Sequence, residues 1–172
     1  LRTNLLFIFE LITQINKMKL RLIAIVFIIS LISCKKLGFS TTPQLKYESV
    51  STTELRRDQS IVFTLSFTDK EGDIPSSNIG DSVLWVSKEV QNGCTADNFA
   101  TYYPSPDFPD QNYLKGTIEV RYTYGIAGPF PSIGDPTCPD KNDTCIFRFA
   151  LRDKARNTSD TVSSGPIVII KN

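Results

Sequence analysis

Hydrophobic and polar residues alternate at every second position in four separate stretches of this sequence. The alternation is clearest at Ser60–Phe67, and it recurs at Asp81–Val90, Leu114–Tyr124 and Thr144–Arg152. A period of two puts successive side chains on opposite faces of a β-strand, so each stretch predicts an antiparallel strand with one buried face. No stretch after Gly38 shows an amphipathic helix of useful length. The sequence therefore predicts an all-β fold.

Weaker strand signals lie at both ends of this set, at Leu45–Val50 and at Ile167–Ile170. About seven strands joined by turns predict an antiparallel sandwich of two sheets. Residues 91–113 are expected to form a long loop. The side chains expected to share one strand face are Ile61, Phe63, Leu65 and Phe67, then Ile118, Val120, Tyr122 and Tyr124, then Cys145, Phe147, Phe149 and Leu151.

Two turn sequences point to a family of domains. The segment from Asp153 to Ser159 reads D-K-A-R-N-T-S, and Thr68–Ile74 reads T-D-K-E-G-D-I. The first resembles the last hairpin turn of bacterial immunoglobulin-like or fibronectin-III-like domains, and the second is similar to acidic turns of such modules. The resemblance covers residues 45–172 and implies an immunoglobulin-like sandwich. Trp85, the only tryptophan, is expected in its core.

The segment Met18–Lys36 has the layout of a secretory signal, with two cations, an apolar run and a small residue before a cysteine. The run from Leu22 to Ile32 is about half of the roughly 20 residues needed to span a bilayer. Its end, Leu31-Ile32-Ser33-Cys34, resembles the lipobox of bacterial lipoproteins. That resemblance implies cleavage after Ser33 and acylation of Cys34.

These signals divide the chain into four parts. Residues 1–17 contain no methionine and are interpreted as sequence upstream of the start at Met18, residues 18–33 as a signal-peptide helix, residues 34–44 as a tether and residues 45–172 as the sandwich. An uncleaved anchor that reaches back through Leu5–Ile15 is the alternative. It would place charged side chains in lipid, at about 2.5 to 3.5 kcal/mol for each central charge.

Composition narrows the possible functions. The chain has 19 Lys and Arg against 18 Asp and Glu, and this balance gives no basic face for nucleic acid. It has no histidine, so the commonest general base and the commonest transition-metal ligand are missing. We therefore expect a non-catalytic protein without a cofactor, and calcium is the one ion for which the sequence offers ligands.

Three cysteines follow Cys34, and an exported protein can join two of them in a disulfide. Cys138 and Cys145 flank the turn-rich hexapeptide P-D-K-N-D-T and are the favoured pair. The alternative joins Cys94 to one of them and closes a larger loop. The remaining thiol is expected to be a buried small hydrophobe.

Three acidic residues alternate in the turn after the strongest strand. Asp69, Glu71 and Asp73 offer oxygen ligands around Gly72, and calcium takes 6 to 8 such ligands. Asp153 or Asp160 would complete a cluster if the two turns meet at the same end of the sandwich. The alternative is a solvated acidic turn without a metal.

Aromatic residues are frequent in the predicted loop 91–113. Tyr102, Tyr103, Phe108 and Tyr113 would form a surface for sugar rings or a protein partner, since tyrosine offers a flat apolar face together with a hydroxyl. The alternative is that these rings pack onto the edge of the sandwich.

Together these features predict a lipid-anchored envelope protein that acts as a non-catalytic interaction or accessory module. A glycan- or calcium-binding module on a lipoprotein is the alternative. Lys35 stands where an aspartate would retain some lipoproteins in the inner membrane, so the resemblance favours the outer membrane. No acidic run follows the cysteine, which favours the periplasmic face over the cell surface.

Overall fold

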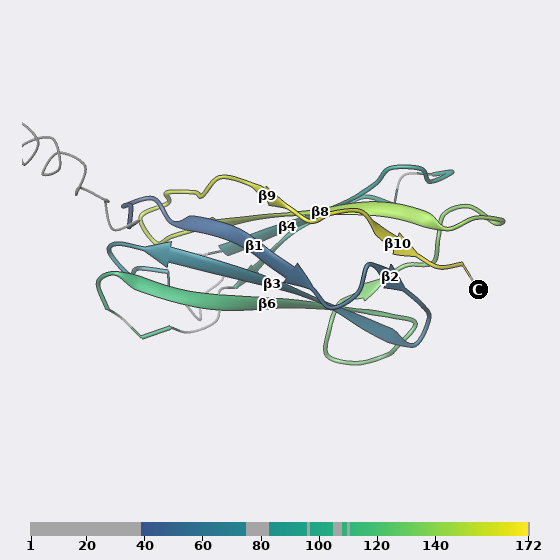
Figure 1. The fold of residues 1–172 in the computed structure, drawn as a ribbon, viewed down its shortest axis with the longest axis horizontal. Helices are drawn as coiled ribbons and strands as arrows, with labels where there is room; N and C mark the ends of the chain where they lie inside the picture. The colour runs from purple at the N-terminus through teal and green to yellow at the C-terminus, as the bar shows by residue number, and fades with distance from the viewer. Residues whose placement is uncertain (1–38, 75–82, 96, 105–107, 110, 172) are drawn as a thin grey trace, which may run out of the picture. The chain divides into compact units, whose positions relative to one another are not determined.

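The computed structural model describes residues 39–74, 83–95, 97–104, 108–109 and 111–171. All regular secondary structure within these residues is β-strand, in ten strands that form two sheets (Figure 1). The lipobox Leu31–Cys34 and the expected signal helix lie outside the described residues. No helix in the described part is long and apolar enough to cross a membrane.

The first sheet has the strand order β1-β3-β6-β7. The long strand β3 pairs antiparallel with β1 on one side and with β6 on the other, and β7 pairs in parallel with the end of β6. The bounds are Gln44–Val50 for β1, Gln59–Asp69 for β3, Leu114–Tyr124 for β6 and Ser132–Ile133 for β7.

The second sheet has the order β2-β10-β8-β4-β5, with β9 paired to β8 outside this path. The long strand β8 pairs antiparallel with β4, β9 and β10, whereas β10 pairs in parallel with β2. The bounds are Glu54–Leu55 for β2, Val83–Val90 for β4, Phe99–Pro104 for β5, Asp143–Arg152 for β8, Val162–Ser163 for β9 and Ile167–Ile169 for β10.

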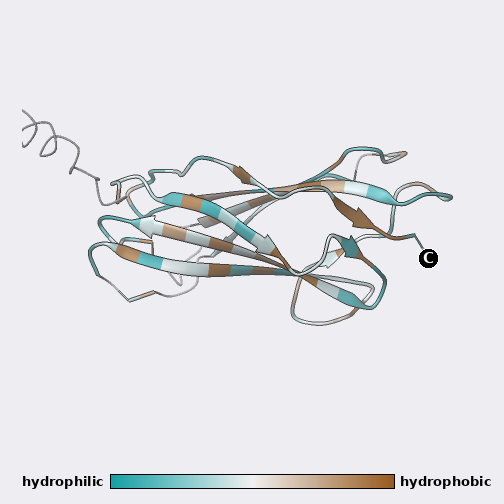
Figure 2. Ribbon diagram, viewed as in Figure 1, coloured by the Kyte–Doolittle hydropathy of each residue, from teal (hydrophilic) through white to brown (hydrophobic). Residues whose placement is uncertain are grey.

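The core lies between the two sheets and is built by the predicted alternation. Hydrophobic and hydrophilic residues alternate along β3, β6 and β8 (Figure 2). Phe63 of β3 packs against Phe147 and Phe149 of β8, with ring centroids 4.7 and 5.3 Å apart. All twelve residues predicted for the shared faces of these three strands are buried, so their burial on one face of each strand is confirmed.

The sheets differ from the prediction in two respects. They are mixed rather than purely antiparallel, because the short strands β2 and β7 join the sheet edges in parallel. The predicted loop 91–113 contains β5, which pairs with β4 along its length. The burial of β5 does alternate, but its sequence F-A-T-Y-Y-P does not show it, because a threonine stands at an inner position and a tyrosine at an outer one.

The expectation of a core position for Trp85 was wrong. Leu84 and Val86 take the inward positions of β4 and are buried, so Trp85 between them lies on the opposite face of the sheet and is only partly buried. Side chains alternate strictly along a strand, and in β4 the set that faces the core includes Leu84 and Val86. The core therefore received the aliphatic set, and the tryptophan lies outside it.

The predicted disulfide between Cys138 and Cys145 was also wrong. The bond joins Cys94 to Cys138, with Cα atoms 5.0 Å apart. Cys145 is an inward residue of β8 with no exposed surface, so its thiol points into the core and away from the turn. The loop that carries Cys138 packs instead against the loop of Cys94, where the Cys94 amide donates to the Thr137 hydroxyl at 3.0 Å.

Candidate metal centre

Two turns meet at the pole of the sandwich where β3 and β8 end (Figure 1). One follows Asp69, the last residue of β3, and the other follows Arg152, the last residue of β8. They bring Asp69, Asp73 and Asp153 together, and one ligand oxygen from each lies within 4.8 Å of the others. Three carboxylates from two turns thus share one small site.

Backbone amides shape the first turn around Asp69. Its Oδ2 atom accepts hydrogen bonds from the amides of Gly72 at 2.6 Å and of Asp73 at 3.2 Å. Gly72 has a φ of +69°, and a Cβ there would lie 1.8 Å from the carbonyl oxygen of Gln111. Only glycine fits this position, because it accepts a positive φ and brings no side chain into that contact.

The second turn is held in the same way by Asp153. Its two oxygens accept from the amide and from the side-chain Nδ2 of Asn157, at 2.7 and 2.8 Å. The two turns are joined directly, since the amides of Lys154 and Ala155 donate to the carbonyl and to Oδ2 of Asp73, each at 3.2 Å. The D-x-A-x-N sequence therefore fixes the carboxylate of Asp153 beside that of Asp73.

The site concentrates negative charge that the described residues do not neutralise. Asp69 and Asp153 have no exposed surface, and Asp73 is partly buried. The Oδ1 atoms of Asp69 and Asp73 are buried and accept no hydrogen bond. The pKa of Asp69 is raised to about 6, chiefly by burial and in part by the charges of Asp73 and Asp153, although the two backbone amides oppose the rise. No described lysine or arginine forms an ion pair with any of the three.

The other sequence candidates for this site lie elsewhere. Glu71 is exposed and faces Lys70, whose Nζ is 3.8 Å from its carboxylate. Asp160 is exposed and takes no part in the cluster. The structure thus groups Asp69 and Asp73 with Asp153 instead of Glu71, because the turn leaves Glu71 exposed beside Lys70 and the turn after β8 brings Asp153 to the site.

The arrangement suits a hard divalent cation. Carboxylate oxygens are the ligands of calcium and magnesium, and calcium accepts irregular sets completed by carbonyl oxygens and water. Magnesium requires a near-ideal octahedron and is seldom held by an all-protein cage. Three carboxylates supply part of a calcium shell of 6 to 8 oxygens, and the two unpartnered oxygens are free to bind the ion.

The start of the described chain lies against the same two turns. The carbonyl oxygen of Ser40 accepts from the amide of Lys70 at 3.1 Å, and that of Thr41 accepts from Nδ2 of Asn157 at 3.4 Å. Phe39 packs edge to face on Tyr113, with centroids 5.4 Å apart. Residues 39–41 of the predicted tether are therefore fixed to the loops that carry the carboxylates.

The four aromatic candidates do not form one surface. Tyr102 and Tyr113 are exposed by 59% and 58%, but Tyr103 alternates with Tyr102 on β5 and turns inward, where its hydroxyl meets that of Tyr122 at 3.2 Å. Phe108 packs on Phe67 with centroids 4.8 Å apart. The interpretation that these rings cover the sandwich edge therefore holds for Tyr103 and Phe108.

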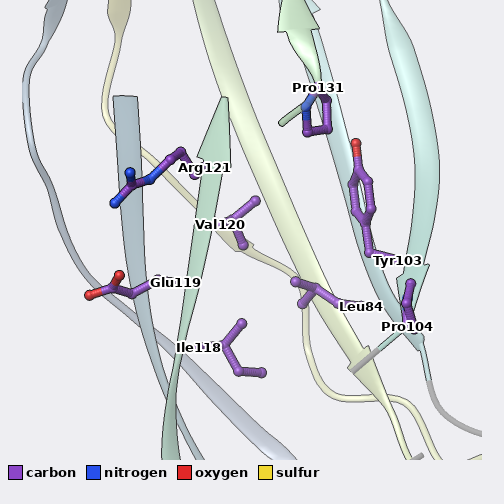
Figure 3. A pocket seen from close by; sticks show the side chains of 8 residues that line it. All are labelled: Leu84, Tyr103, Pro104, Ile118, Glu119, Val120, Arg121 and Pro131. Carbon is purple, nitrogen blue, oxygen red and sulfur yellow. The ribbon is translucent and has the colours of Figure 1, made fainter. Parts of the chain in front are cut away.

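A small hollow of about 160 Å³ opens between β5 and β6. Leu84, Ile118 and Val120 point into it, whereas Glu119 and Arg121 point away (Figure 3). The side chains that point into it in this view are apolar.

A second group of titratable side chains surrounds Lys88, which points inward from β4 and is buried. Its Nζ pairs with Asp97 and lies 5.7 Å from the ring centre of Phe99. Burial raises the pKa of the neighbouring Cys145 thiol to about 11, so this cysteine stays protonated and unreactive at neutral pH. The group is a paired charge at the edge of the core.

Comparisons with known proteins give little beyond this geometry. No family model matches the chain, and no curated protein matches it. A solved structure of a beta-glucosidase from Listeria innocua in complex with gluconolactone is similar over 74% of this chain, with 12% identity and a TM-score of 0.39. The chain spans 16% of the length of that enzyme. A likeness at this level assigns neither a family nor an activity.

Proposed function

We propose that this chain is a lipid-anchored envelope module with an immunoglobulin-like sandwich that binds calcium through Asp69, Asp73 and Asp153. The observation that carries the proposal is the pair of buried carboxylate oxygens, on Asp69 and Asp73, that accept no hydrogen bond within a cluster of three acids. A buried charge without a partner is costly, and a bound cation removes that cost.

Calcium would act as a structural clamp in this module. The ion would join the end of β3 to the turn after β8, and thus one sheet to the other. The turns also hold residues 39–41, so occupancy would fix the start of the domain together with its loops. A stabilised sandwich of this kind suits an interaction or accessory role better than catalysis.

The calcium site is tested by thermal unfolding of the purified protein in EDTA, in calcium and in magnesium. A ligand at 100 times its Kd stabilises the folded state by about 2.7 kcal/mol, which raises Tm by roughly 10 °C for a domain of this size. We expect calcium to produce such a shift and magnesium to produce little. Equal melting curves in calcium and EDTA would refute the site.

The anchor and the location are separate parts of the proposal and rest on the sequence. The Leu31–Cys34 lipobox supports acylation of Cys34, and several acyl chains on one cysteine would hold the protein durably where a single chain is marginal. Mass spectrometry of the natural protein is expected to find an acylated Cys34 as the first residue. A free thiol at Cys34 with leader residues still attached would overturn this part.

The outer membrane, with the domain on the periplasmic side, is the proposed location. Labelling of intact cells with a membrane-impermeant reagent is expected to leave the domain unmodified, and lysis is expected to expose it. Labelling of intact cells to the level of the lysate would place the domain on the surface instead.

A further inference from the structure

A hollow of about 280 Å³ lies on the outer face of the second sheet. It is lined by residues of three adjacent strands, β5, β4 and β8, and of the segment before β9. Ala150 of β8 is the smallest of these residues, and its short side chain leaves room between larger neighbours. The volume is slightly below the range of pockets for drug-sized ligands, so one sugar unit is a suitable occupant. The lining residues are Trp85, Tyr102, Ala150, Arg152, Thr158 and Thr161.

Two aromatic side chains form one part of this hollow. Trp85 of β4 and Tyr102 of β5 are directly opposite residues in the antiparallel ladder, which places their Cβ atoms about 5 Å apart. Neither ring belongs to the core, because Leu84, Val86 and Tyr103 occupy the inner positions. The pair presents a broad apolar ring surface with an indole N–H and a hydroxyl at its edges.

Arg152 adds a positive charge that no described residue balances. Its Nε atom is buried and has no hydrogen-bond acceptor. Arg148, four residues earlier on the same strand face, forms an ion pair with Glu89, whereas no described carboxylate does so for Arg152. A buried donor without an acceptor is unfavourable, and a bound ligand that supplies the acceptor removes that cost. The guanidinium fork matches a carboxylate, which can bind it through two hydrogen bonds.

We propose that this hollow binds an acidic sugar, namely a hexuronic acid unit of a polysaccharide. The apolar face of the sugar ring would lie on Trp85 and Tyr102, and its carboxylate would bind Arg152. A neutral sugar would leave the charge of the guanidinium unbalanced, because its hydroxyl groups accept hydrogen bonds but carry no negative charge. A free phosphate would leave both rings uncovered. An acidic sugar satisfies the two features at once.

The test uses the emission of Trp85, which reports on this hollow alone because the chain has one tryptophan. The purified protein is titrated with trigalacturonate in EDTA, so that calcium bridging plays no part. The neutral trisaccharide of galactose serves as the matched ligand. We expect a saturable change with trigalacturonate in the millimolar range or below and at least tenfold weaker binding of the neutral sugar. No saturable change, or equal affinity for the two sugars, overturns the proposal.

Two variants separate specific recognition from general attraction between charges. Arg152→Gln is expected to weaken trigalacturonate binding at least tenfold, whereas Arg148→Gln removes an equal charge from the same strand face and is expected to leave it unchanged. Equal losses in both variants would refute the site. If Arg152→Gln does not fold, Tyr102→Ala replaces it, because the Tyr102 side chain is 59% exposed and its loss should leave the fold intact. Binding of trigalacturonate to this variant is measured by calorimetry. Loss of binding supports the proposal, and retained affinity overturns it.

Discussion

Replacing Asp69 by asparagine is expected to stabilise the protein in the absence of metal. Burial and two neighbouring carboxylates raise the pKa of Asp69 from 3.8 to about 6. At about 1.4 kcal/mol for each pKa unit, holding this group ionised at pH 7.5 costs the folded state about 3 kcal/mol. Asparagine keeps an oxygen for the amides of Gly72 and Asp73 and removes the charge, so Asp69→Asn should recover about 2 to 3 kcal/mol.

The same substitution should abolish the response to calcium. The wild-type protein is expected to gain about 2.7 kcal/mol at calcium concentrations 100 times the Kd, and the Asp69→Asn variant little or nothing. Urea unfolding at pH 7.5, followed by Trp85 emission, measures both effects as shifts of the transition midpoint at constant slope. The variant should therefore be the more stable protein in EDTA, and the two should converge in calcium.

Glu71→Gln is the matched control for this experiment. It removes one charge from the same turn, but Glu71 is exposed and lies outside the cluster. We expect its stability to change by less than about 0.5 kcal/mol in either solution. The reasoning is refuted if Asp69→Asn is less stable than wild type in EDTA, or if it gains as much from calcium as wild type does.

Further outcomes follow from the same geometry. Between about pH 4 and pH 6 in EDTA, Asp69 keeps its proton in the folded state and has lost it in the unfolded state, so wild-type stability should fall relative to Asp69→Asn as pH rises through that window. Urea midpoints at several pH values measure this trend. A rise in relative stability would contradict the assignment. Gly72→Ala drives a Cβ into a carbonyl oxygen at positive φ and should cost at least about 2 kcal/mol, together with the calcium-induced Tm shift. Replacing Cys94 and Cys138 by serine opens a loop of 44 residues and should cost about 4 kcal/mol by chemical denaturation; an unchanged midpoint would exclude a stabilising role. Cys145 should resist a thiol reagent at pH 8 until the protein is unfolded, because its thiol is buried with a pKa of about 11.

The long strands could be predicted from the sequence because alternation reports burial directly. Ile61 to Phe67 alternate without interruption, and β3 lies in the middle of its sheet with a partner on each side. Short strands carry no such signal. The strand β7 has two residues, and it forms because β6 offers it an open edge.

Only part of the candidate site could be predicted from the sequence. Asp69 and Asp73 follow a predicted strand, but the contribution of Asp153 depends on two turns about 80 residues apart reaching the same pole. The spacing of residues cannot show which member of D-K-E-G-D turns outward, and this is why Glu71 was included. Trp85 was misplaced for a similar reason, since both faces of β4 contain apolar residues and the sequence does not show which face meets the core.

The two ends of the described domain leave it at opposite poles (Figure 1). Ser40 and Thr41 are hydrogen-bonded to the loops of the acidic turns, and β10 runs toward the far pole. A pulling force between the two ends would run lengthwise along β1 and load its ladder with β3 in shear. In that geometry the hydrogen bonds between the two strands share the load and must break together, instead of breaking one after another. Such a domain would be mechanically stiff along its long axis and would transmit strain between its ends with little extension.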